Sequence, residues 1–103
     1  MLAIDCLEIF KALSNEKRLE ILLWLKEPHR YFSCAEGMDF EKHGVCVGYI
    51  QKRSGLTQST ISEYLTILKK AGLVESVRIG QWTYYKRNEK VFKELSRIIK
   101  TNI

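Results

Sequence analysis

Cysteine and histidine side chains are the residues of this chain best able to bind a metal or react covalently, and they are Cys6, Cys34, Cys46, His29 and His43. His43 and Cys46 are three residues apart, which is one helical turn if a helix runs through both. Cys34 would then have to be brought to them by the intervening chain. Thiolates and imidazoles suit a thiophilic metal ion, so one hypothesis is a metal site of Cys34, His43 and Cys46, with Asp39 as a further ligand.

The cysteines also allow two interpretations without a metal. Cys34 and Cys46 could form a redox pair that closes when the chain between them moves. Cys46 could instead be a buried packing residue, as free cysteines often are, and Cys6 is expected on the face of a helix. The odd number of cysteines at irregular spacing is no disulfide framework, which favours a cytosolic protein. The residues alone leave the thiol chemistry open.

Features expected of an enzyme are weak. Both histidines lie in an irregular region, and the sequence has no Gly-rich phosphate loop or paired carboxylate motif. Cys46 with His43 nearby could act as a thiol nucleophile, but no third group that would orient the base is evident. We therefore expect a protein without catalytic activity and keep a thiol enzyme as an alternative.

The clearest structural pattern is a short helix, a tight turn and a longer capped helix. The short helix is expected to begin near Val45 and to end at residues 54–55, and the turn follows at 55–57. Thr57 is a strong N-cap for the second helix, over residues 58–71. This order is typical of a helix-turn-helix, in which a platform helix and its turn hold the second helix out from the body.

The second helix of this pattern carries side chains suited to contact DNA bases. Its apolar seam, at Ile61, Leu65 and Leu68, should face the core. Small hydrogen-bonding groups on the opposite face fit a major groove and can bind base edges there. The predicted base-contacting residues are Gln58, Ser59, Thr60, Ser62, Glu63 and Tyr64. The alternative is a generic polar helix start in a module that binds other proteins without reading DNA.

A β-hairpin is predicted next, from segments 73–78 and 82–87, which are rich in β-branched and aromatic residues and flank Gly80. Polar and basic side chains on such a hairpin can bind the DNA backbone or an adjacent minor groove. The predicted contacts are Arg78, Gln81, Lys86 and Arg87. The alternative is that these charges only protect an exposed edge strand.

Charge is distributed unevenly along the 103 residues. Residues 1–47 contain 6 basic and 8 acidic side chains, whereas residues 48–103 contain 11 basic and 4 acidic ones. The formal net charge of +5 therefore arises in the half with the predicted base-contacting helix, as a phosphate-binding surface requires. Double-stranded DNA is the partner that this distribution favours.

Length and hydropathy restrict the class of protein further. A chain of 103 residues suffices for one domain, over 1–103. The longest obvious apolar run, at 21–25, is far shorter than the ~18 residues of a membrane helix. Residues 1–8 include acidic side chains where a signal peptide would have basic ones. These features predict a cytoplasmic protein without membrane contact.

The remaining elements would support the helix-turn-helix, in a fold that is mainly α with a small β-hairpin. Helices are expected over 2–13, over 15–27 with Ser14 as N-cap, and over 89–100, while 29–45 is expected to be a long loop. The first and last helices carry more apolar surface than a small domain needs, which predicts a homodimer, with a monomer core as the alternative. The predicted interface residues are Leu2, Leu7, Val91, Phe92, Leu95, Ile98 and Ile99.

The block from Gly55 to Val74, Gly-Leu-Thr-Gln-Ser-Thr-Ile-Ser-Glu-Tyr-Leu-Thr-Ile-Leu-Lys-Lys-Ala-Gly-Leu-Val, resembles the signature of the ArsR/SmtB-type winged helix-turn-helix repressors. Similar to that family, too, are Ala12-Leu-Ser-Asn15 with Arg18 and Ile21-Leu22, and Arg78-Ile-Gly80-Gln-Trp82 with Tyr84-Tyr85. The resemblance covers nearly the whole chain except residues 29–43. It implies a homodimeric repressor, paired through its first and last helices, that releases its operator when a metal ion or thiol chemistry changes its shape.

The metal-binding residues that the resemblance implies are only partly present. The family's box in the platform helix reads Cys-Val-Cys-Asp, whereas this chain has Cys46-Val-Gly-Tyr49, and one thiolate does not hold a thiophilic ion. The family's other site uses histidines and carboxylates of the last helix. Here Glu89 is retained, but Val91 and Asn102 stand where histidines are expected. The resemblance therefore implies a DNA-binding repressor with a degraded metal site and an inducer that the sequence leaves open.

Overall fold

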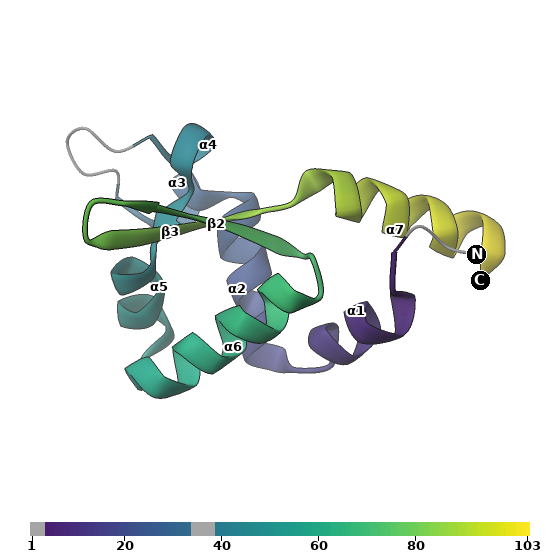
Figure 1. Cartoon of the computed structure of the whole chain (residues 1–103), viewed down its shortest axis with the longest axis horizontal. Helices are drawn as coiled ribbons and strands as arrows, with labels where there is room; N and C mark the ends of the chain where they lie inside the picture. Colours follow the sequence, from purple (N-terminus) through teal and green to yellow (C-terminus); the bar gives the residue numbers. More distant parts are fainter. Residues whose placement is uncertain (1–3, 34–38) are drawn as a thin grey trace.

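The computed structural model describes residues 4–33 and 39–103, and in it helices surround one small sheet (Figure 1). The elements in chain order are α1 (Cys6–Leu13), α2 (Glu16–Lys26), α3 (Pro28–Tyr31), α4 (Phe40–His43), β1 (Val45–Cys46), α5 (Val47–Ser54), α6 (Gln58–Lys70), β2 (Val74–Ile79), β3 (Trp82–Arg87) and α7 (Glu89–Asn102). None of the helices in the described part of the chain has the length and apolar character needed to cross a membrane.

Side-chain caps explain where the first helices begin. The Asp5 carboxylate accepts the backbone N–H of Glu8 at 3.0 Å, so α1 begins at Cys6 rather than at residue 2. Asn15 caps α2 by accepting the N–H of Arg18 at 2.9 Å. The prediction that Ser14 caps α2 is wrong, because its hydroxyl donates to the Phe10 carbonyl at the end of α1.

The segment predicted as a long loop contains regular structure on both sides of residues 34–38. The Asp39 carboxylate accepts two backbone N–H groups and starts α4, and Gly44 ends it at a φ of 89°. A Cβ on Gly44 would lie 2.2 Å from the Tyr85 carbonyl oxygen, so only glycine allows the chain to pass so close to β3. Strand β1 follows at once, and the predicted hairpin is therefore part of a three-stranded antiparallel sheet in the order β1-β3-β2.

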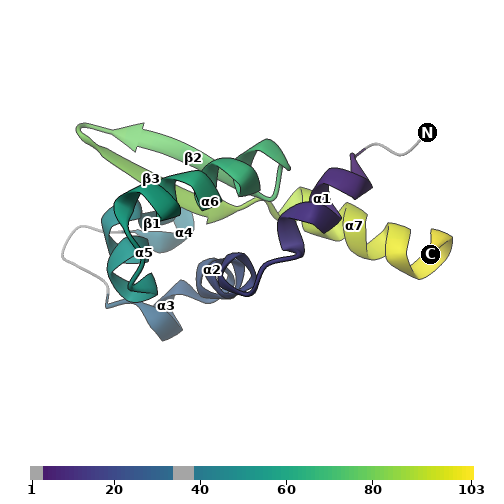
Figure 2. The same cartoon turned by 90° about the horizontal axis from the view of Figure 1, so that it is seen from below.

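Helix α2 lies at the centre of the fold, in contact with α1, α5, α6 and β3. It buries Ile21, Trp24 and Leu25, whereas Leu19 and Leu23 are apolar side chains exposed outside the buried face. The view in Figure 2 shows α6 alongside the sheet, with the β2–β3 hairpin extending beyond it. At the other end of the molecule lie α1 and α7, next to the two termini (Figures 1 and 2).

Candidate nucleic-acid interface

The turn between α5 and α6 is held by short-range hydrogen bonds. Gly55 adopts a left-handed conformation with φ of 70° and ends α5. The buried Ser54 hydroxyl donates to the Gln51 carbonyl at 2.7 Å and accepts the N–H of Leu56 at 3.1 Å. Thr57 then caps α6 by accepting the N–H of Thr60 at 3.2 Å. The predicted tight turn is confirmed, and Ser54 is a positioning residue that the sequence pattern did not single out.

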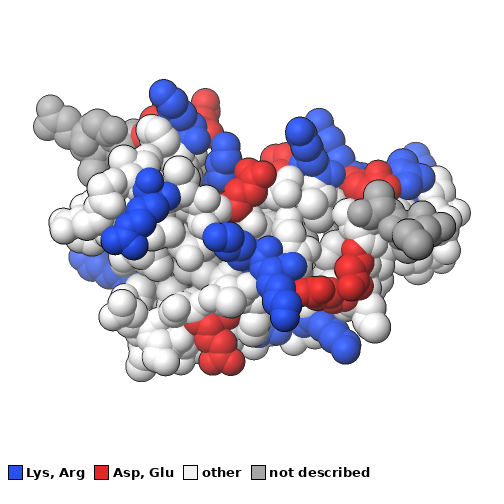
Figure 3. Space-filling model, in the orientation of Figure 1, with Lys and Arg blue, Asp and Glu red and all other residues white. Residues whose placement is uncertain are grey.

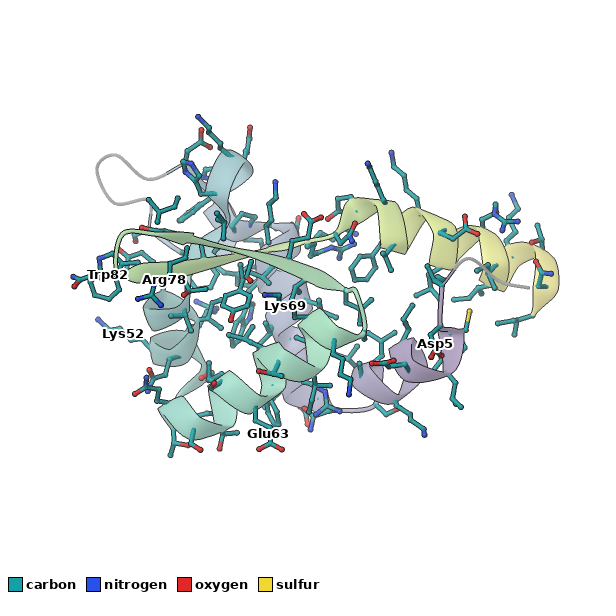
Figure 4. All side chains as sticks on the ribbon, in the orientation of Figure 1. Asp5, Lys52, Glu63, Lys69, Arg78 and Trp82 are labelled. Carbon is teal, nitrogen blue, oxygen red and sulfur yellow. The ribbon has the colours of Figure 1, made fainter. Side chains whose placement is uncertain are left out.

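Helix α6 has one fully buried face and one free face. Ile61, Leu65 and Leu68 are completely buried, which fixes the rotation of the helix about its axis. The opposite side carries the exposed side chains of Gln58, Ser59, Ser62 and Glu63. In Figure 4 Glu63 points away from the rest of the protein. A slim polar face of this kind can enter a major groove.

Two of the six predicted base-contacting residues have partners within the chain. The half-buried Thr60 has its hydroxyl 3.0 Å from that of Thr57, so it takes part in the helix cap. Tyr64 lies under the guanidinium of Arg18, 5.2 Å from the ring centroid, and its hydroxyl accepts from Asn15 Nδ2 at 3.5 Å. Arg18 also donates to the Ala12 carbonyl at 2.7 Å. Tyr64 thus fastens α6 to the start of α2.

The hairpin formed by β2 and β3, here called the wing, carries two exposed polar side chains at its tip. Ile79 pairs with Trp82 across the turn, and Gly80 supplies the positive φ of 63°. Arg78 and Gln81 are exposed, and Arg78 Nε donates to the Gly80 carbonyl at 3.3 Å. Figure 4 shows Arg78 at this end of the molecule. The tip can therefore offer a cation and an amide to a nucleic acid.

The other two basic residues predicted on the wing lie at its base. Lys86 is half-buried and pairs across the sheet with Glu75. It also lines a hollow next to α4, together with His43.

 Its register places it four positions along β3 from Trp82, so it is remote from Arg78. Arg87 has only 11% of its side chain exposed, donates twice to Glu89 at 3.0 and 3.2 Å, and lies 3.7 Å from the Phe92 ring centroid. Arg87 shares the core face of the sheet with Val74 and anchors α7, which argues against the predicted DNA contact.

Figure 3 shows the distribution of basic side chains on one face of the molecule. On the face drawn in Figure 3, Lys and Arg lie in separate groups over the sheet and near α6, with acidic side chains between some of them. Lys69 and Lys70 stand in the last turn of α6, where cations favour the helix dipole.

Cys46 and His43 do not form the helical pair that their spacing allowed. Gly44 ends α4 directly after His43, and Cys46 lies in β1, opposite Tyr84. Cys46 is 7% exposed, whereas Cys6 is half-buried on α1. The Asp39 carboxylate serves as the cap of α4. Among residues 4–33 and 39–103 no three His, Cys, Asp or Glu side chains gather as a metal would require.

Cys34 lies outside the described residues, so neither its pairing with Cys46 nor its part in a metal site is tested. Glu89, the retained residue of the last-helix site, is occupied by Arg87. The thiol and metal hypotheses therefore remain predictions.

Tyr85 lies on the core face of the sheet, where burial raises the pKa of its phenol above the ordinary value.

The terminal helices separate the predicted dimer residues into two groups. Leu95 and Ile98 are buried within the single chain, which for these two favours the monomer-core alternative. Leu7 is 64% exposed and Ile99 is 47% exposed, which leaves apolar surface on both α1 and α7. Val91 and Phe92 are half-buried. Leu2 lies outside the described residues.

Comparison with known proteins identifies relatives of the whole chain. The sequence model of a family described as "bacterial regulatory protein, arsR family" matches residues 44–76, from Gly44 to the start of β2. An uncharacterized HTH-type transcriptional regulator of Bacillus subtilis (strain 168), YbzH, is 55% identical over 97 residues, which are 94% of this chain and 97% of the relative. The arsenical resistance operon repressor of the same organism is 35% identical over 80 residues, which are 78% of this chain and 63% of the repressor.

Solved structures show the same architecture. The homodimeric winged helix-turn-helix DNA-binding domain of Mb0332 from Mycobacterium bovis, described as a possible ArsR-family transcriptional regulator, is 28% identical and superimposes with a TM-score of 0.66. The match covers 92% of this chain and 74% of that one. The predicted winged helix-turn-helix is thereby confirmed, with β1 added to its sheet.

Proposed function

Because the chain belongs to the ArsR family of HTH-type transcriptional regulators, we propose that it acts in the cytoplasm as a homodimeric repressor of transcription that binds operator DNA. The observation that carries this proposal is that α6 has one apolar face and one polar face. Its apolar side is completely buried, and its polar side is exposed next to a turn fixed by Ser54 and Thr57. The buried face and the turn fix the position of α6, and its exposed polar side chains are available to bind a rigid target such as DNA.

In the proposed complex α6 enters the major groove. Gln58 can make a bidentate contact with adenine, and the hydroxyls of Ser59 and Ser62 can serve either base pair. Glu63 stands on the same exposed side and can accept from the exocyclic amine of cytosine. Thr60 and Tyr64 position the helix from its edges rather than contacting bases through their hydroxyls. Four side chains thus remain as candidates for direct readout.

The wing supplies contacts outside the major groove. Arg78 and Gln81 project from its tip and can bind phosphates or the floor of an adjacent minor groove. Such contacts fix the orientation of the protein and add affinity that falls as salt rises. We assign no DNA contact to Arg87, and Lys86 is too far from the tip to share one with Arg78.

Dimerisation would place two such surfaces on one operator. Support comes from the Mycobacterium bovis domain, which is homodimeric, and from the exposed apolar side chains of Leu7 and Ile99. Two α6 helices, one from each protomer and related by a twofold axis, would enter successive major grooves about 34–36 Å apart. A palindromic operator follows from this symmetry.

The test is a gel shift of the purified protein on the DNA upstream of its own gene, at two salt concentrations and against random DNA of equal length. The proposal expects tighter binding to the upstream DNA, weakening as salt rises. Equal affinity for both DNAs at both salt concentrations, or no shift at all, would overturn it. Absence of any shift would favour the protein-binding module, and a catalytic activity that is lost on thiol-specific labelling would favour the thiol enzyme.

A further inference from the structure

A hollow of about 440 Å³ lies between the platform helix α5 and the wing. Its walls come from three elements, β1, α5 and β3, and the residues that line it are Cys46, Gly48, Tyr49, Lys52, Trp82 and Tyr84. Figure 4 labels Lys52 and Trp82, which lie at the same end of the molecule. We call this hollow the joint pocket, because it is formed where α5 meets the sheet.

Aromatic rings form the body of the joint pocket. Tyr49 comes from α5, and Trp82 and Tyr84 come from one face of β3, two residues apart. Trp82 is 52% exposed, a large fraction for so large an apolar side chain. Gly48 widens the pocket, because a Cβ built there meets no atom within 4 Å. The space therefore suits a flat ring that stacks on or against aromatic neighbours.

The polar groups around these rings can all donate hydrogen bonds, although the two hydroxyls and the thiol can also accept them. Tyr49 and Tyr84 offer hydroxyls, Trp82 an indole N–H, Lys52 an ammonium group and Cys46 a thiol. None of them has a side-chain hydrogen bond or an ion pair with another residue in the described ranges 4–33 and 39–103. Among the described residues, no carboxylate lines the pocket. A set of donors around a cation, with no carboxylate among the described lining residues, favours an acceptor with negative charge.

We propose that the joint pocket binds a planar aromatic carboxylate of one or two rings. The ring lies among Tyr49, Trp82 and Tyr84, and the carboxylate faces Lys52. The site is separate from the exposed face of α6, and the pocket can bind this ligand whether or not the protein binds DNA. An occupant touches both α5 and β3, so it would also bridge the platform helix and the wing.

The first experiment uses 2-naphthoate as the probe and the 15N-labelled protein without DNA. The chain has two tryptophans, so the NMR spectrum has two indole N–H signals. Trp82 lines the pocket, whereas Trp24 is 6% exposed in the core and 6.4 Å from Phe32, ring to ring. Titration should shift the Trp82 signal in a saturable way and leave the Trp24 signal in place. No saturable shift of Trp82, or equal shifts of both, would overturn the proposal.

The charge of the ligand is tested with 2-naphthamide, which keeps the rings and lacks the negative charge. The carboxylate should bind about three- to fivefold more tightly, as expected for one exposed ion pair. Lys52→Met keeps the length of the side chain and should remove this difference. Equal affinities for the acid and the amide in the wild type would show that an aromatic ring alone is recognised, which contradicts the proposal.

The location is tested by filling the space above Gly48. Gly48→Leu should weaken 2-naphthoate binding at least about tenfold, and Gly48→Ala is the matched control that changes the backbone preference with a much smaller side chain. Both variants should keep the wild-type fold, since the position is helical and open. Circular dichroism checks the fold. A folded Gly48→Leu variant that binds the probe as the wild type does would overturn the assignment.

Discussion

The guanidinium of Arg53 lies 4.8 Å from the ring centroid of Tyr31, and its Nη1 donates a hydrogen bond to the Tyr31 carbonyl at 2.9 Å. The same guanidinium is 5.2 Å from the ring of Trp24. Arg53 is exposed, yet it connects the end of the platform helix to α2 and α3. One charged side chain thereby couples three helices.

Replacing Arg53 with alanine should therefore lower stability. Loss of one hydrogen bond and of the cation–aromatic contacts predicts a loss of about 1–2 kcal/mol in the free energy of unfolding. For a domain of this size each kcal/mol lowers Tm by about 4–8 °C. Lys52→Ala, at the neighbouring exposed position, is the control and should leave Tm nearly unchanged. Equal effects of the two substitutions in calorimetry would contradict the coupling.

Ile99→Glu should dissociate the homodimer without unfolding the protomer. Ile99 is exposed in the single chain, so a charge there is tolerated in the monomer but is unfavourable in an apolar interface. Ile98→Glu should instead unfold the chain, because Ile98 is completely buried. Analytical ultracentrifugation with circular dichroism separates the two outcomes. A folded Ile99→Glu variant that stays dimeric, as the Lys93→Glu control should, would exclude α7 from the interface.

Ser62→Ala tests direct readout by α6. If the hydroxyl binds a base edge, its loss should cost about 1–3 kcal/mol on the specific site and little on random DNA. Ser96→Ala, an exposed serine on α7, is the matched control. Binding is measured by fluorescence anisotropy on both DNAs. Parallel losses on specific and random DNA would show that Ser62 does not read sequence.

Two arginines of the wing should respond in opposite ways. Arg78→Ala should weaken binding to all DNAs and lower the salt slope by about one, as expected for a phosphate contact. Arg87→Ala should instead lower stability by about 1–3 kcal/mol, because Arg87 is hydrogen-bonded to Glu89 and packed on Phe92. Salt titrations and thermal melts of both variants test this. A reduced salt slope in Arg87→Ala would restore Arg87 to the DNA-binding set.

The thiol hypothesis predicts operator release on treatment with diamide. Two thiols, those of Cys34 and Cys46, would form a disulfide and transfer two electrons and two protons to the diazene. Cys34→Ser and Cys46→Ser should each abolish the response, whereas Cys6→Ser should retain it. Zinc and arsenite form a second arm, because a soft ion held by the same thiolates would also release DNA. Loss of response in Cys6→Ser alone, or none in the wild type, would leave Cys46 as a packing residue.

Local sequence patterns were sufficient for the helix-turn-helix. The cap at Thr57 and the seam of Ile61, Leu65 and Leu68 depend on residues three or four positions apart, and both are found in the structure. The wing is also a local hairpin, and its two strands and its turn at Gly80 were predicted within a residue. The polar face of α6 followed directly from these elements.

Long-range contacts account for what the sequence pattern missed. Strand β1 has two residues, too few for a periodic signal, and exists because Val45 and Cys46 pair with Tyr85 and Tyr84 of β3. Arg87 reads as an ordinary exposed base until the position of Phe92 is known. The terminal stripe mixes buried Leu95 with exposed Ile99, and only the packing of α7 on the fold separates the two.

The short strand β1 also makes the wing mechanically uneven. It pairs with β3 at Tyr84 and Tyr85 only, so the base of the hairpin is held on both sides while the segment from Arg78 to Thr83 has a single partner strand. The wing is therefore held firmly at its base, whereas its tip can bend. Bending should concentrate just beyond Tyr84, where it moves the tip as a unit and leaves α6 in place. Arg78 can then reach the DNA backbone beside grooves of different width without disturbing α6 in the major groove.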